Sequence, residues 1–197
     1  LLSFLDKEKL PNFSKTWVPS RLLLGPGPSN AHPEVLKALS LNPIGHLDEA
    51  YLELMSDVQK LLRYAWQCDN RITLPMSGTG SAAMEASIAN FIEEGEKILI
   101  AKKGYFGERL VDMASRYKAD VSVMSKEWGE SFSFEEIKYE IEKQKPSIFA
   151  IVHAETSTGV LQPLEGIGEV CRENNCLFLV DAVTSLGATK LLIDDWQ

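Results

Sequence analysis

The chain has 197 residues, of which 45% are hydrophobic and 24% are charged, as is usual for a soluble globular protein with a sizeable core. Its 20 basic and 28 acidic residues give a formal net charge of −8, so we expect no nucleic-acid partner. No apolar run approaches the roughly 18 residues of a membrane span, and the apolar opening from Leu1 to Leu5 is too short for a signal peptide. We therefore expect a cytoplasmic protein with no membrane partner, and a peroxisome or another organelle remains the alternative location.

The three cysteines Cys68, Cys171 and Cys176 are odd in number and lack the paired spacing of a zinc site or a redox motif. Free thiols of this kind are typical of a reducing compartment. We predict that all three are structural and that the protein has no metal site.

The order of the predicted elements is that of an α/β fold, in which short apolar runs alternate with helical stretches. Residues 1–20 have weak periodicity and are predicted to form an arm that lies on another surface, while residues 21–197 belong to one domain. Helices are expected first over residues 33–41 and 51–65. The predicted strands are 71–76, 97–101, 120–124, 147–153 and 176–181, and the predicted crossover helices are 81–91, 107–116, 134–144 and 164–174.

The first informative loop is Ser-Gly-Thr-Gly-Ser at residues 77–81, between a predicted strand and a predicted helix. In parallel sheets ligands bind beyond the carboxyl ends of the strands. At Gly78 and Gly80 the backbone N–H groups can approach an anion, and Thr79 and Ser81 add hydroxyl donors at a helix start. The loop is predicted to be a phosphate cradle, although a glycine-rich turn with a serine cap has the same pattern. It lacks the Gly-Lys-Ser/Thr ending of a nucleotide-hydrolysing loop.

A dinucleotide site is the rival interpretation of this loop, because residues 78–83 also match the G-x-G-x-x-A pattern. An NAD site needs an acidic residue at the end of the next strand, and that strand ends in Ala101-Lys102-Lys103. Only an NADP-dependent oxidoreductase therefore remains as a distant alternative.

Three further loops follow the later strands. Phe106 lies just before a helix, where an aromatic ring either stacks on a planar cofactor or packs in the core. The loop from His153 to Gly159 is rich in hydroxyls, and with Glu155 it either binds a polar ligand or caps the next helix. His153 itself is expected to be a core histidine. Asp181 ends an apolar strand, so it requires a cation or several donors, or else it caps a helix.

The four loops together indicate a ligand with a phosphate, a flat aromatic ring and a cation in that ring, and pyridoxal phosphate has all three. In addition, the segments LLLGPGPSN at residues 22–30, SGTGS at 77–81, ETSTGVLQPL at 155–164 and LVDAVTSLG at 179–187 resemble the class V aminotransferases in order and spacing. The similarity covers nearly all of residues 21–197. It is closest to the alanine–glyoxylate and serine–pyruvate group.

The resemblance implies the large domain of a fold-type I transferase and a homodimer with its active sites at the subunit interface. Its cofactor would be pyridoxal 5′-phosphate. Thr79, Gly80 and Ser81, with Gly78 in the same loop, would hold the phosphate. The implied contacts of the ring are Phe106, where relatives often have Trp, Thr156, where Ser is common, Asp181 at the pyridine nitrogen and Val183 on the opposite ring face. In the loop of residues 25–28, Gly27 would approach the substrate through its backbone.

The resemblance also places the lysine that binds the cofactor shortly after the position equivalent to Gln197, and the arginine that binds the substrate far beyond it. Lys190 does not lie in the lysine motif. We therefore expect the chain to be a piece of a longer protein, ending before the C-terminal half and inactive by itself. The parent is expected to transfer an amino group from alanine or serine to a small 2-oxo acid such as glyoxylate or pyruvate. Another class V reaction, such as an elimination, and a non-catalytic partner subunit are the alternatives.

Overall fold

The computed structural model describes residues 18–197, which fall into two compact units divided between Leu41 and Asn42. The described part of the first unit contains one short helix, α1 (Pro33–Ala38), whose start is capped by His32 through a bond from the Glu34 N–H. The predicted arm over residues 1–20 lies almost wholly outside the described residues, so its contact with another subunit stays a prediction.

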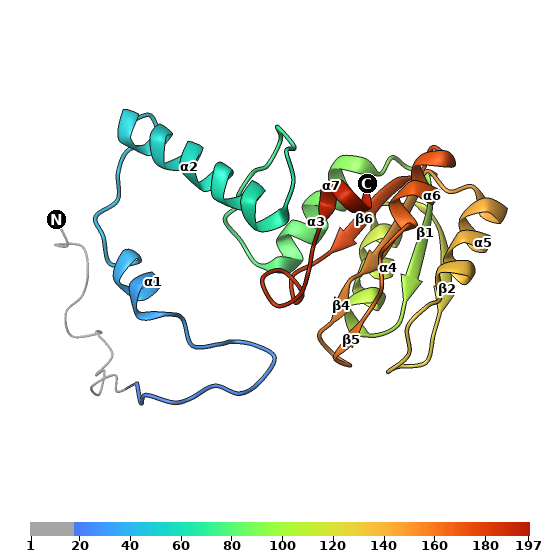
Figure 1. The fold of residues 1–197 in the computed structure, drawn as a ribbon, viewed down its shortest axis with the longest axis horizontal. Helices are drawn as coiled ribbons and strands as arrows, with labels where there is room; N and C mark the ends of the chain where they lie inside the picture. The colour runs from blue at the N-terminus through green and yellow to red at the C-terminus, as the bar shows by residue number, and fades with distance from the viewer. Residues whose placement is uncertain (1–17) are drawn as a thin grey trace, which may run out of the picture. The chain divides into compact units, whose positions relative to one another are not determined.

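The second unit is the α/β domain that the sequence predicts (Figure 1). Four of the predicted strands and the predicted helices form within a few residues of the expected bounds. In chain order the elements are α2 (Glu49–Trp66), α3 (Gly80–Phe91), β1 (Lys97–Lys102), α4 (Tyr105–Arg116), β2 (Asp120–Ser125), α5 (Phe134–Gln144), β3 (Ile148–Val152), β4 (Ala154–Glu155), β5 (Val160–Leu161), α6 (Ile167–Glu173), β6 (Leu177–Asp181) and α7 (Ile193–Trp196).

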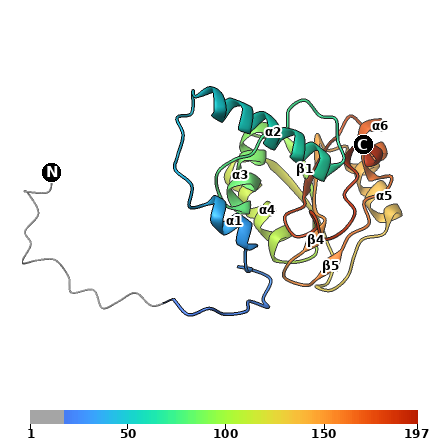
Figure 2. The ribbon, with the colours of Figure 1, turned by 60° about the vertical axis from the view of Figure 1, so that its left-hand side comes forward.

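The main sheet has the strand order β2-β1-β3-β6, and every neighbouring pair is parallel. Because successive side chains of a strand point to opposite faces, β1 and β3 supply both cores of the unit. Leu99 and Phe149 pack with α5 and α6, whereas Ile98 and Ala150 pack with α3 and α4. Figure 2 shows the two pairs of helices on opposite faces of the sheet. The carboxyl ends of all four strands therefore lie along one edge.

The predicted strand at residues 71–76 is wrong: this segment is irregular in the structure. Its alternating apolar side chains Ile72, Leu74 and Met76 are 60–82% exposed. A strand exists only where a neighbour pairs its backbone N–H and C=O groups. Among residues 18–197 this segment has no such neighbour, so the alternating pattern alone does not produce a strand.

Two smaller differences have local causes. Helix α6 begins at Ile167 and not at residue 164, because Gly166 precedes it with a left-handed φ of 79°. Leu164 instead joins the core at 1% exposure. The short antiparallel pair β4–β5 was not predicted, since each strand has only two residues. Within the described part of the chain, no helix has both the length and the hydrophobicity needed to cross a bilayer.

Candidate active site

A cavity of about 200 Å³ lies where the loops after the strands meet the start of α3. It brings together seven of the residues singled out from the sequence, which come from four separate loops. The lining residues are Thr79, Gly80, Ser81, Met84, Phe106, Val152, Ala154, Thr156, Asp181, Val183 and Thr184. The predicted meeting of these loops at one edge of the sheet is therefore confirmed, while the role of each residue stays a prediction.

The start of α3 forms one wall of this cavity. Thr79 is the N-cap, and its hydroxyl accepts a hydrogen bond from the Ala82 N–H at 3.3 Å. Gly80 is the first helical residue, and a Cβ there would lie 3.0 Å from a methyl group of Val183. A side chain at residue 80 would therefore require Val183 to shift by a few tenths of an ångström or more. Gly78, which was also predicted to bind the phosphate, does not line the cavity and lies one residue before the cap.

Ser81 is joined to an arginine that the sequence analysis did not select. The Arg109 guanidinium donates to the Ser81 Oγ at 2.5 Å and to the Tyr105 hydroxyl at 2.8 Å. It also lies 5.7 Å from the centre of the Phe106 ring. A positive charge thus stands beside the predicted phosphate cradle. The spacing of Tyr105 and Arg109, four residues apart on one helix face, is the sequence signal that was available.

Phe106, predicted just before a helix, lies in the first turn of α4, and Thr156 directly follows β4. The Phe106 ring is half-buried and packs edge-on against Tyr105, with 5.4 Å between the ring centres. The Thr156 hydroxyl is hydrogen-bonded to that of Thr184, which lines the cavity as well and was not predicted. The cavity thus offers a flat apolar ring and a hydroxyl group within one small space.

Asp181 is the one charged residue among the described residues that line the cavity. It ends β6, and its Oδ1 accepts a hydrogen bond from the Val183 N–H at 3.0 Å. Burial raises the pKa of the Asp181 carboxyl, the bond from Val183 opposes this, and the negative charge of Glu155 raises the pKa further. A cation placed in the cavity would reverse this shift by favouring the carboxylate.

The loop after β3 also contains His153, which we expect to be a core histidine, and Glu155, for which the sequence allows either ligand binding or helix capping. His153 is 2% exposed, its Nδ1 is hydrogen-bonded to the Ser185 Oγ at 2.9 Å, and its ring packs edge-on against Trp196. Burial and the positive charge of Lys103 lower the pKa of His153, as expected for a core histidine. Glu155 does cap a helix, but that helix is α4, which precedes it in the chain.

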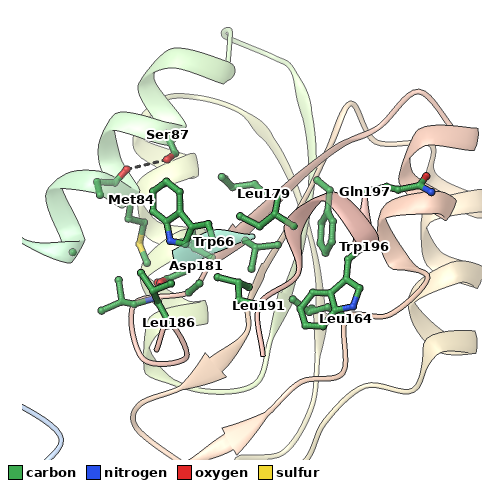
Figure 3. Close-up of a pocket in the computed structure, with 18 residues that line it drawn as sticks. Trp66, Met84, Ser87, Leu164, Leu179, Asp181, Leu186, Leu191, Trp196 and Gln197 are labelled. Carbon is green, nitrogen blue, oxygen red and sulfur yellow. Dashed lines mark hydrogen bonds between the residues drawn. The ribbon is translucent and has the colours of Figure 1, made fainter. Parts of the chain in front are cut away.

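A second cavity of about 510 Å³ shares Gly80, Met84, Asp181 and Val183 with the first. Its remaining lining is almost entirely apolar. Figure 3 shows Trp66 and Asp181 at one end of it and Leu164 and Trp196 at the other. Its position beside β6, which has no second neighbour among residues 18–197, explains why so much apolar surface is left open.

Gly27 belongs to the first unit and is described there by itself. Its loop is closed by Asn30, whose side chain accepts from the Leu23 N–H at 2.8 Å and donates to the Arg21 carbonyl at 2.9 Å. The predicted role of Gly27 at the substrate stays a prediction. All three cysteines are free and buried, and within residues 18–197 no cluster of His, Cys, Asp and Glu side chains is suited to hold a metal ion.

Comparisons with family models, curated proteins and solved structures all identify aminotransferases as similar proteins. The model of the family "Aminotransferase class-V" matches residues 22–197. The chain is 43% identical over 177 residues to alanine–glyoxylate aminotransferase of Mus musculus, covering 90% of this chain and 43% of the relative. It is 41% identical over 179 residues to (S)-ureidoglycine–glyoxylate transaminase of Bacillus subtilis, covering 91% and 43% respectively.

A crystal structure of alanine–glyoxylate aminotransferase from Nostoc sp. superimposes on this chain with a TM-score of 0.93 at 58% identity. The match covers 99% of this chain and 52% of that one. The chain thus spans about half the length of the curated relatives it matches.

Proposed function

This chain belongs to the class V aminotransferase family, and from that premise we propose that the whole protein transfers an amino group from alanine or serine to a small 2-oxo acid such as glyoxylate or pyruvate. Pyridoxal 5′-phosphate is the cofactor that the family implies. The observation that carries the proposal is the cavity of about 200 Å³, in which a helix start, a flat ring, a hydroxyl and a half-buried carboxylate meet.

The residues of this cavity fit the cofactor by their chemistry. A phosphate requires N–H groups and hydroxyls at a helix start, which Thr79, Gly80 and Ser81 supply, and Arg109 adds a positive charge. A carboxylate favours the protonated form of a ring nitrogen, and within residues 18–197 the Asp181 carboxylate accepts one hydrogen bond, in a site that disfavours its charge. The proposed assignment is therefore that the start of α3 holds the phosphate and Asp181 holds the proton on the ring nitrogen.

When bound, the cofactor supplies the ring that carries the amino group and withdraws the electrons released with the α-proton. The described residues have supporting tasks. Phe106 and Val183 would give the ring apolar contacts, and Thr156 with Thr184 would hold the ring hydroxyl. Asp181 keeps a proton on the ring nitrogen, because a carboxylate in a poorly solvated site favours the cationic form of its partner. Donor and acceptor alternate in one site, as in ping-pong transfer.

The experiment is to add pyridoxal phosphate to the whole protein and to follow amino transfer from alanine and from serine to glyoxylate. We expect glycine to form together with the oxo acid of the donor. Loss of the donor without glycine formation would favour an elimination, and tight NADPH binding without amino transfer would favour the oxidoreductase alternative. We further propose that the functional unit is a homodimer, which the resemblance implies and which the exposed apolar residues of α2 support.

A further inference from the structure

Glu155 is a completely buried carboxylate, at 0% exposure, in the two-residue strand β4 next to the cavity. It does not line the cavity itself. A buried carboxylate is costly unless several donors meet it. Its contacts therefore indicate what the folded protein uses it for.

These contacts join two walls of the cavity. The Glu155 Oε1 accepts from the Phe106 N–H at 3.3 Å, and the Oε2 accepts from the Gly107 N–H at 3.2 Å. The Oε1 also accepts from the Ser157 hydroxyl at 2.8 Å, and the Ser157 Oγ in turn accepts from the Tyr105 N–H at 3.0 Å. The first N–H groups of α4 are thus bonded by the loop that also carries Thr156.

Helix α4 depends on this distant cap because its own N-cap is Gly104, which has no side chain to offer. A Cβ at Gly104 would lie 2.4 Å from the Glu155 Cγ and 2.7 Å from the Ser157 Oγ. The absence of a side chain at residue 104 is therefore what lets the carboxylate reach the helix start.

A buried lysine completes the arrangement. Lys103 is 1% exposed, and its Nζ donates to the carbonyl of Val160, the residue that pairs with Glu155 in β4–β5. The positive end of α4 and the lysine both offset the charge of the carboxylate. Groups of the protein itself thus compensate part of the charge of the Glu155 carboxylate.

On this geometry, and resting on the proposed function, we propose that Glu155 is a positioning residue of the cofactor pocket. It fixes the backbone of Phe106 against the loop of Thr156, and so sets the spacing of the two groups assigned to the cofactor ring. Its effect on the cofactor is transmitted through these two residues, since it touches neither the cavity nor its contents.

The test is Glu155→Gln in the whole protein. The amide puts an NH₂ group in place of one oxygen, so either the bond from the Gly107 N–H or the bonds from the Phe106 N–H and from Ser157 are lost. We expect faster hydrogen exchange in the first turn of α4 and about tenfold weaker binding of pyridoxal phosphate. At saturating cofactor we expect an altered visible circular dichroism band, because the walls around the ring are displaced.

The matched control is Ser133→Ala, which removes the capping box at the start of α5, away from the cavity. Loss of this cap is expected to lower the melting temperature by about 2–4 °C while leaving cofactor affinity and the dichroism band unchanged. A general loss of stability is thereby separated from loss of positioning.

A Glu155→Gln protein with wild-type affinity and a wild-type band would overturn this inference alone. A wild-type protein that does not bind pyridoxal phosphate would instead refute the proposed function. If Glu155→Gln does not fold, Ser157→Ala replaces it, because that change removes only the link to Tyr105 and one bond to the carboxylate. About threefold weaker binding is then expected, and unchanged binding overturns the proposal.

Discussion

Asp181 is placed at the end of an apolar strand with one N–H donor, and burial raises the pKa of its carboxyl. A carboxylate in such a site stabilises a cationic partner more than the carboxylate of an ordinary helix cap would. The reason is that the cation neutralises a negative charge that water solvates poorly. The local bond to Val183 alone does not distinguish the two roles, since Asn forms the same bond.

We predict that Asp181→Asn keeps the fold and some cofactor binding but lowers the rate of α-proton removal on the order of 10²-fold. Single-turnover kinetics with alanine measures this rate. The matched control is Asp48→Asn at the start of α2, where the carboxylate also accepts from the N–H two residues ahead. This control should be nearly silent. A wild-type rate in Asp181→Asn would remove Asp181 from the mechanism.

Lys103 gives a pH dependence of stability. Burial lowers its pKa to about 8, although the charge of Glu155 opposes the shift. Between pH 8 and 10.5, the ordinary pKa of a lysine, the unfolded chain therefore binds more protons than the folded one, so the free energy of unfolding from this group rises with pH. Below pH 8 both states carry the proton and this contribution is flat.

We predict that Lys103→Met removes this rise. The measurement is the melting temperature of wild type minus that of the variant, followed from pH 7 to about 10.5. This difference in melting temperature should increase as the pH rises. The exposed Lys118→Met serves as control and should keep the wild-type slope, because Lys103 still titrates there. A difference curve for Lys103→Met that is flat or falls with pH contradicts the prediction.

The side chains that follow the strands could be assigned to one site from the sequence, because parallel strands bring their carboxyl ends to the same edge of the sheet. Phe106, Thr156 and Asp181 were found in this way, whereas Thr79 was found from its glycine-rich helix start, since the strand predicted before it does not form. The contacts among them could not be predicted. Arg109 meets Ser81 across 28 positions of the chain, and no local pattern shows such pairs. The sequence likewise left open whether Glu155 binds a ligand or caps a helix.

At the scale of the element, the start of α3 has a tight neighbour in Val183. We predict that Gly80→Leu weakens pyridoxal phosphate binding about tenfold or more, while Gly80→Ala has a smaller effect, because each added atom displaces the loop after β6. Titration of the whole protein with cofactor measures both. Gly45→Leu is the control, since a Cβ there meets nothing within 4 Å. Unchanged affinity in Gly80→Leu would contradict the phosphate cradle.

A strand or helix could be predicted where the hydrophobic pattern of its segment agrees with the partners that it has in the fold. β1 and β3 are continuously apolar because both of their faces are covered by helices, and α5 has its full capping box in the local sequence. The segment 71–76 has an alternating apolar pattern but no strand partner among the described residues. Pairing is a property of the whole sheet, so its absence could not be inferred from the segment itself.

For the whole molecule, α2 is an 18-residue helix with no buried residue in the described structure. Leu52, Leu54, Leu61 and Tyr64 are each more than half exposed. An apolar surface of this kind marks an interaction site, and a second copy of the chain fits the proposed homodimer.

We predict that the whole protein has the mass of a dimer by light scattering at micromolar concentration. Leu61→Glu should weaken the dimer about tenfold or more, because it places a charge in an apolar contact. Lys60→Glu on the same helix is the control, since Lys60 is exposed and forms only a surface ion pair with Asp57. A monomer mass for the wild type would refute the homodimer.

The cap of α4 makes the first turn of this helix dependent on contacts 48 and 49 positions away along the chain. An isolated helix forms within about a microsecond, but these contacts require closure of a loop of roughly 50 residues after β3 has paired with β1. The wall that carries Phe106 is therefore expected to order late during folding and to open early during unfolding. This wall of the pocket can therefore be completed only after β4 has been synthesised, even though the residues of α3 and α4 precede β4 in the chain.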